Sequence, residues 1–308
     1  MKSSSIITIF TFLIVLLQQI ASANAADQKH VNKLKETKHC MECDLSSENL
    51  NGAQLSGSNL AKVNLKSALL KNANLENSNL INSNLENANL AGASLSNSKL
   101  QGSNLISVNL NNSTIRFANL SQTKLMGAEF LFSNASDTNF SYSNLSSSDF
   151  SNATLQNSNF KNAILDNVNF SKADMRRINL FGASIKDGTL VDANLSNAFM
   201  KAVNLSGADL TGSNLSKAKL STANFEGANL TNANLNKANL ARNIIRVNLK
   251  GANLTGASFV GANLKGANLT NANLTDADFT GANLKKAKLD QVIYCRTIMP
   301  WGEQNDGC

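Results

Sequence analysis

Large hydrophobic residues recur every five positions through most of this chain. Between positions 45 and 240 nearly every multiple of five is Leu or another large apolar residue, and Ala, Ser or Val usually stands two positions earlier. Residues 227–240, GANLTNANLNKANL, show the unit most clearly as small–Asn–Leu–polar–polar. A helix would repeat its apolar face every three to four residues, and a strand every second residue. A period of five fits neither and indicates a tandem-repeat architecture.

The chemistry of this unit predicts one short side and one corner. The small residue and the Leu, two positions apart, point the same way from an extended segment. The Ser, Thr, Gly, Asn, Lys and Glu residues that follow suit a solvent-exposed turn. If four sides close a square, one coil takes about 20 residues and rises by ~4.8 Å. About 51 units then give about 12–13 coils and a rod of ~60 Å.

Tandem A-[N/D]-L-x-x units resemble the pentapeptide-repeat family, and the resemblance covers about five-sixths of the chain. It implies an all-β fold: a right-handed quadrilateral β-helix, or pentapeptide-repeat solenoid, of about 12–13 coils over residues 43–294.

Phe residues at the Leu positions test whether four units make a coil. Phe130, Phe150 and Phe170 would then stack on one side of the square. Phe140 and Phe160 would stack on the opposite side, with Leu between the two stacks.

Residues 1–25 have the features of a secretory signal peptide. These are a basic start at Lys2, a short apolar run over residues 6–17 and a small-x-small sequence that ends at Ala25. Cleavage after Ala25 predicts an exported bacterial protein, periplasmic or secreted, with no membrane span in the mature chain. The alternative is an uncleaved membrane anchor, for which the apolar run is short.

The repeats are expected to end in two caps. Residues 26–42 form the N-terminal cap, in which Val31 and Leu34 are spaced as on one helical turn, and a short helix or arm is expected to cover the first coil. Residues 295–308 form the C-terminal cap. The closing sequence YCRTIMPWGEQNDGC and the leading KHCMECDL resemble the Cys-framed ends of many bacterial pentapeptide-repeat proteins.

The four cysteines, Cys40, Cys43, Cys295 and Cys308, are interpreted first as disulfides because the chain is predicted to be exported. Three pairings are possible. If the chain forms the rod, its ends lie far apart, and only Cys40–Cys43 together with Cys295–Cys308 can form.

The CxxC sequence has two alternative interpretations. His39, Cys40 and Cys43, together with His30, could bind a metal ion, although the chain has no second CxxC. A thioredoxin-like redox pair is the other alternative, but no βαβ pattern accompanies it.

Departures from the repeat mark candidate partner contacts. Phe181 and Phe199 fall at outward positions on the same side, one coil apart, and are expected to form an exposed apolar patch. Ile106 and Met126 pair in the same way on another side. The alternative is that all four are ordinary isolated surface residues.

One residue is missing from the repeat over residues 241–248. The Leu positions run to Leu240 and resume one residue early at Leu249. This register slip predicts a local bulge or kink that brings Arg242 and Arg246 close together. It is either a candidate contact site or a tolerated deletion in an irregular loop.

Charge and residue types argue against catalysis and nucleic-acid binding. The formal net charge is +7, but the lysines are scattered, and no phosphate-binding loop, recognition helix or aromatic interleaving accompanies them. The two histidines, His30 and His39, both precede the repeats, so no catalytic triad can form on the rod. Neither an enzyme nor a site for a cofactor, metal or small-molecule substrate is expected.

These features predict an exported, non-catalytic solenoid that serves as a protein-interaction or structural scaffold for an unidentified protein partner. Some members of the family are DNA mimics that protect a topoisomerase, and the resemblance makes this the alternative. Such proteins resemble a strongly acidic cytoplasmic rod with a C-terminal dimerising helix, whereas this chain is basic and ends in a Cys-framed loop. A secreted effector is a further alternative.

Overall fold

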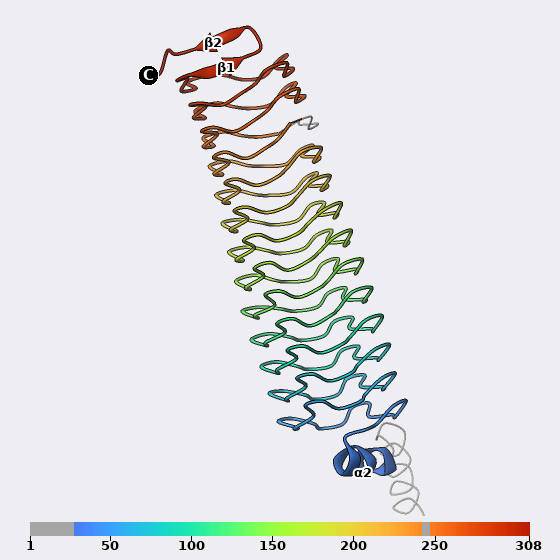
Figure 1. Cartoon of the computed structure of the whole chain (residues 1–308). Coiled ribbons are helices and arrows are strands. Elements are labelled where there is room, and N and C mark those ends of the chain that lie inside the picture. The colour runs from blue at the N-terminus through green and yellow to red at the C-terminus, as the bar shows by residue number, and fades with distance from the viewer. Residues whose placement is uncertain (1–27, 242–246) are drawn as a thin grey trace, which may run out of the picture.

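A computed structural model describes residues 28–241 and 247–308 of the chain. The chain forms a long stack of coils (Figure 1). Helix α2 (Gln28–Thr37) lies at one end, and a hairpin of β1 (Thr297–Met299) and β2 (Gly302–Gln304) lies at the other. The predicted signal peptide, residues 1–25, lies outside the described residues.

The coils are held in register by parallel β-bridges between residues 20 positions apart. Asn59 bridges to Asn79, for example, and Asn119 bridges to Asn139. With five residues in a unit, this spacing gives four units per coil and confirms the predicted four-sided β-helix. The right-handed sense stays an implication of the family resemblance.

Each corner of the described repeats turns through a residue with a positive φ. The second residue after each Leu position has a φ between 49° and 74°. Asn and Gly fill many of these positions because they tolerate the left-handed region of backbone space better than other residues. Thr222, with φ at 60°, is the β-branched exception among the described corners.

Where Asn precedes a Leu position, its side chain satisfies a corner amide group. The Oδ1 of Asn159 accepts a hydrogen bond from Lys161 N, two residues later, at 3.1 Å. The Nδ2 of Asn159 donates to Asn139 Oδ1, one coil earlier, at 3.2 Å. These side chains therefore close the corners and also link successive coils along the faces.

The inward residues form one continuous core along the rod, and the predicted Phe stacks lie within it. The ring centroids of Phe130 and Phe150 are 4.1 Å apart, and those of Phe150 and Phe170 are 5.2 Å apart. Phe140 and Phe160 stack at 4.6 Å on the opposite side. Rings from the two sides meet edge to face at 5.9–6.2 Å. The predicted stacking is confirmed.

Helix α2 covers the first coil, as the spacing of its apolar residues predicted. Val31 and Leu34 are both buried. The Nδ1 atom of His30, on the same helix, accepts a hydrogen bond from the amide of Asp44 at 3.2 Å. Of the residues that the structure describes, none belongs to a helix long and apolar enough to cross a bilayer.

A disulfide lies within each end of the chain. Cys40 is bonded to Cys43, and Cys295 is bonded to Cys308, with Cα atoms 5.3 and 4.8 Å apart. These are the two pairings expected for a rod. The sulfur atoms of the CxxC sequence are bonded to each other, so they do not form the metal site considered for His39 and these two cysteines.

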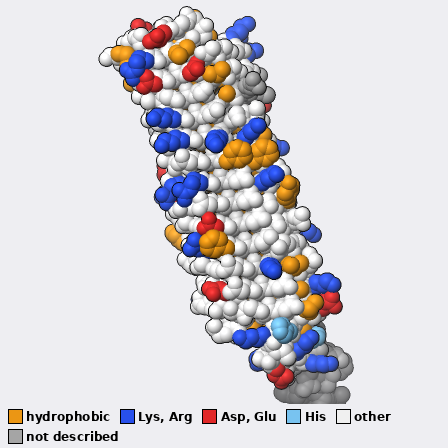
Figure 2. All heavy atoms as spheres, in the orientation of Figure 1, with side chains coloured by type: hydrophobic (Ala, Val, Ile, Leu, Met, Phe, Trp, Pro, Cys, Tyr) orange, Lys and Arg blue, Asp and Glu red, His pale blue; other side chains and the backbone are white. Residues whose placement is uncertain are grey.

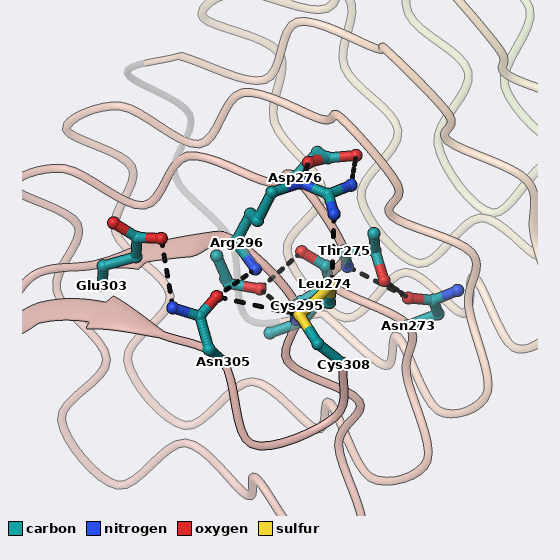
Figure 3. The surroundings of a disulfide bond; sticks show 10 residues. Asn273, Leu274, Thr275, Asp276, Cys295, Arg296, Glu303, Asn305 and Cys308 are labelled. Atoms are coloured by element: carbon teal, nitrogen blue, oxygen red, sulfur yellow. Dashed lines mark hydrogen bonds and ion pairs between the residues drawn. A yellow bond between two sulfur atoms is a disulfide. The ribbon is translucent and has the colours of Figure 1, made fainter.

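The C-terminal hairpin is tied to the last coils by several polar contacts (Figure 3). Arg296 binds both carboxylate oxygens of Asp276, at 2.6 and 2.9 Å. The amide of Arg296 donates to Asn305 Oδ1 at 2.7 Å. Thr297 Oγ1 donates to the carbonyl oxygen of Leu274 at 2.8 Å. Together with the disulfide, these contacts hold the end of the chain over the open edge of the rod.

The bridge spacing changes by one residue at the predicted slip. Asn229 bridges to Asn248, which is 19 positions later, and Asn248 bridges to Asn268, which is again 20 positions later. The repeat is therefore one residue shorter at this point, but the residues that follow stay on the same sides of the rod. Arg242 and Arg246 lie outside the described residues, so their expected proximity stays a prediction.

Candidate interaction face

One side of the rod carries a pair of stacked aromatic rings. Phe199 occupies the outward position of this side, where its side chain is 38% exposed, and Phe181 lies at the adjoining corner one coil earlier. The ring centroids are 5.9 Å apart and the planes differ by 9°. The structure therefore brings together the two residues that the sequence placed side by side. Phe181 is half-buried rather than exposed, because its ring packs against Phe199 and beneath Lys161.

The aromatic pair interrupts a ladder of side-chain amides. Asn139 donates to Asn119, Asn159 to Asn139, and Asn179 to Asn159, each along the same side. Phe199 bridges to Asn179 through the backbone but has no amide with which to continue this ladder. The side thus changes from polar to aromatic at this height of the rod.

Cationic groups adjoin the pair. The Nζ atom of Lys161 lies 5.8 Å from the centroid of the Phe181 ring, within the range of a cation–π interaction. On the other corner of the same side, Arg177 Nε donates to Asn157 Oδ1 at 2.8 Å. Figure 2 shows Lys and Arg side chains beside exposed hydrophobic side chains on the face in view.

Arg176, next to Arg177, is compensated by a carboxylate. Its Nε and Nη2 atoms each lie 2.8 Å from an oxygen of Asp174. Burial raises the pKa of Asp174, but hydrogen bonds from Arg176 and Gln156 outweigh this effect, so the pKa lies below its ordinary value. Asp174 is therefore ionised at neutral pH and pairs with Arg176, whereas Arg177 is hydrogen-bonded to a neutral amide.

Ile106 and Met126 lie one coil apart at another corner. The amide of Ser107 donates to the carbonyl oxygen of Met126 at 2.9 Å, which fixes the register of the two coils. Both side chains are half-buried. This pair therefore offers a partner less apolar surface than an exposed pair would.

Three exposed aromatic side chains of the described repeats were not singled out by the sequence. Phe117, Phe132 and Tyr142 are 54%, 59% and 55% exposed. Each is the second residue of a corner and has a positive φ. At 20 residues per coil they fall on three different corners, so they do not form a single patch. Their position in the five-residue unit was the signal that could have identified them.

A rod of four-sided coils with bridged, amide-laddered sides is the architecture of a β-helical solenoid of tandem pentapeptides. The family model "Pentapeptide repeats" matches the chain in eight copies, among them residues 39–77, 68–105, 103–141, 143–182, 190–227, 223–270 and 257–293. The chain belongs to the pentapeptide-repeat family.

Solved structures of this family are similar to parts of the chain. HetL, a pentapeptide-repeat protein of the cyanobacterium Nostoc sp. strain PCC 7120, is 25% identical over 88% of this chain and 90% of its own, with a TM-score of 0.22. Trypsin-treated QnrB1, a plasmid-mediated fluoroquinolone resistance protein, is 21% identical over 62% of this chain and 88% of its own, with a TM-score of 0.37. The thylakoid-lumen protein AT2G44920 of Arabidopsis thaliana is 35% identical over 38% of this chain and 65% of its own, with a TM-score of 0.13. No curated protein sequence matches the chain.

Proposed function

We propose that the chain is an exported, non-catalytic solenoid that binds a protein partner through Phe181 and Phe199. The observation that carries this proposal is the stacked aromatic pair, which replaces an amide ladder on one side of the rod. Aromatic side chains, Phe among them, are enriched in the buried cores of protein interfaces. A side built from backbone bridges is already ordered before a partner arrives, so little conformational entropy is lost on binding.

The proposed mature protein begins after cleavage at Ala25. Its N-terminal cap is residues 26–42, its repeats are residues 43–294 and its C-terminal cap is residues 295–308. The two disulfides support export, because such bonds persist mainly in oxidising compartments. Cell fractionation with intact-mass analysis tests this: we expect a chain that starts at residue 26, outside the cytoplasm, and gains about four hydrogens on reduction. A full-length, reduced, cytosolic chain would refute export.

The charge of the chain favours this proposal over topoisomerase protection. A DNA mimic presents clustered carboxylates, whereas this chain has a formal net charge of +7. A role as a secreted effector is compatible with the proposed interaction face, since an effector also acts by binding a partner.

Capture experiments test the proposed face. The immobilised protein is mixed with extract from the cells that produce it, and the bound proteins are identified and quantified. We expect the double variant Phe181→Ser with Phe199→Ser to capture at least tenfold less of the specific partner than the unchanged protein does. The matched control is Phe132→Ser, which makes the same chemical change at an exposed position on a corner that does not flank this side. Unchanged capture by the first variant, with both variants folded by circular dichroism, would rule out this face as the binding site.

A further inference from the structure

The side that bears Phe181 and Phe199, together with its two flanking corners, collects most of the positive charge of the adjacent coils. We call this surface, between residues 156 and 241, the basic face. The bridge period of 20 places seven cationic residues on it: Lys161, Arg176, Arg177, Lys201, Lys217, Lys219 and Lys237. The same period places no Asp or Glu on it.

The acidic residues of these coils lie on the other sides and corners. Residues 156–241 contain six acidic residues: Asp166, Asp174, Asp187, Asp192, Asp209 and Glu226. All six fall outside the basic face, as do the remaining two cations, Lys172 and Lys186. The charges of residues 156–241 are therefore sorted by side.

Most cations of the basic face are available to a partner. Lys201, Lys217, Lys219 and Lys237 are exposed, and none of them forms an ion pair with another of the described residues. Arg176 is the exception, because it is paired with Asp174 on the adjoining side. The face therefore keeps an uncompensated positive potential beside the aromatic pair.

The aromatic pair adds to this preference for an anion. One face of the Phe181 ring is turned toward Phe199 and Lys161 lies over the ring, so the ring edge is the part left for a partner. The edge of an aromatic ring carries partial positive charge. A carboxylate beside an aliphatic or aromatic group matches both features.

We propose, on the basis of the proposed function, that the partner binds this face through an extended acidic protein segment that also carries an apolar side chain. From Lys161 to Lys237 the face covers almost four coils, or ~18 Å at the usual strand spacing. An extended peptide of about five or six residues spans that length. Arg177, Lys217 and Lys237 follow one corner at intervals of two coils and then one, which does not match the even charge spacing of a nucleic acid.

A labelled peptide of sequence Glu-Asp-Phe-Glu-Asp-Glu is the probe, and its Gln/Asn counterpart is the neutral control. Fluorescence anisotropy with the full chain measures the affinity of each at several salt concentrations. We expect the acidic peptide to bind at least tenfold more tightly than the neutral one, with an affinity that falls as salt rises. A single-stranded oligonucleotide and a sulfated polysaccharide are measured in parallel. Tighter binding of either polymer than of the acidic peptide would overturn the proposal, as would no binding of the peptide.

Charge reversal tests the location. The variant Lys201→Glu with Lys219→Glu changes the basic face, and Lys172→Glu with Lys186→Glu makes the same change in net charge on other corners of residues 156–241. We expect the first pair to weaken peptide binding at least tenfold and the second pair to change it less than twofold. Equal losses for both pairs would show that only net charge matters and would overturn the proposal.

The two proposals fail in distinguishable ways. If capture of the cellular partner requires Phe181 and Phe199 but survives reversal of Lys201 and Lys219, the aromatic interaction face stands and the acidic segment is refuted. If capture survives both sets of changes, the proposed function fails as well.

Discussion

Phe130 and Phe150 are 20 residues apart in the sequence, and their rings lie 8° from parallel with centroids 4.1 Å apart. Both rings are fully buried, and each also meets Phe140 edge to face. The rings thus meet face to face along the axis and edge to face across it. The middle coils are therefore held by a cluster in which each ring supports its neighbours.

Loss of one of these rings should destabilise the middle of the rod. We expect Phe150→Ala to lower the free energy of unfolding by about 3–5 kcal/mol, because the surrounding rings cannot collapse into the cavity. Phe132→Ala, at a corner where the ring is 59% exposed, should change it by less than about 0.5 kcal/mol. Urea unfolding followed by circular dichroism measures both. Equal effects would mean that the Phe cluster contributes no more than a surface residue.

Relief of backbone strain should stabilise the chain at Thr222. A β-branched residue with φ at 60° is costly, and Asn accepts this conformation more readily. We expect Thr222→Asn to raise the free energy of unfolding by about 1 kcal/mol. Thr231→Asn is the control, because Thr231 lies at a first corner position without a positive φ and its Oγ1 donates to Asn229 Oδ1. Thermal unfolding compares the two, and a gain at both positions would contradict the strain argument.

Two buried serines should respond in opposite ways to removal of the hydroxyl group. Ser158 Oγ donates to the carbonyl oxygen of Leu155 at 2.6 Å, whereas Ser213 Oγ has no hydrogen-bond partner among the described residues. We expect Ser158→Ala to cost about 1 kcal/mol and Ser213→Ala to cost nothing or to stabilise. Parallel denaturant titrations of the two variants test this. A larger loss at Ser213 than at Ser158 would show that its hydroxyl group is satisfied in solution.

Acid should loosen the C-terminal cap. The hydrogen bonds and the charge of Arg296 lower the pKa of Asp276 below its ordinary value. A carboxyl whose pKa is lower in the folded state stabilises that state fully above its unfolded pKa of about 3.9, and the stabilisation is lost as the pH falls through the lower folded value. We expect amide exchange protection at Ile298, whose amide donates to Ala277 O, to fall below about pH 4.

Asp276→Asn provides the control for this pH dependence. The Asn variant cannot ionise, so its cap should be less protected at pH 7 and should show little further loss on acidification. If the wild-type cap and the Asn variant lose protection in parallel as the pH falls, the ion pair is not the cause.

The core could be predicted from the sequence because inward positions follow directly from the repeat period. Phe259 and Phe279 obey the same rule and stack with centroids 4.7 Å apart, yet they were not predicted. They lie after the register slip, so they are no longer at multiples of five. Counting the missing residue would have identified this stack.

The surface was harder to predict, because it depends on winding the chain and on side-chain orientation. Lys161, Lys201 and Lys219 are scattered in the sequence. They come to lie on the basic face only when 20 residues are wound into each coil. The half-burial of Phe181 depends on how its ring lies against Phe199, and the spacing of the two residues does not specify this. The role of the Asn side chains in closing corners also required atomic geometry.

The 20-residue bridge period gives insertions and deletions very different consequences for the surface. An insertion of five residues preserves the hydrophobic period, so the core stays packed, but it turns every later residue onto the next side and divides any surface that spans the insertion point. An insertion of 20 residues keeps every side intact and lengthens the rod by ~4.8 Å. The loss of one residue before Asn248 neither turns the later residues onto another side nor changes the number of coils, since Asn229 and Asn248 still pair. In this protein the length of an insertion, more than its composition, determines whether a binding surface stays assembled.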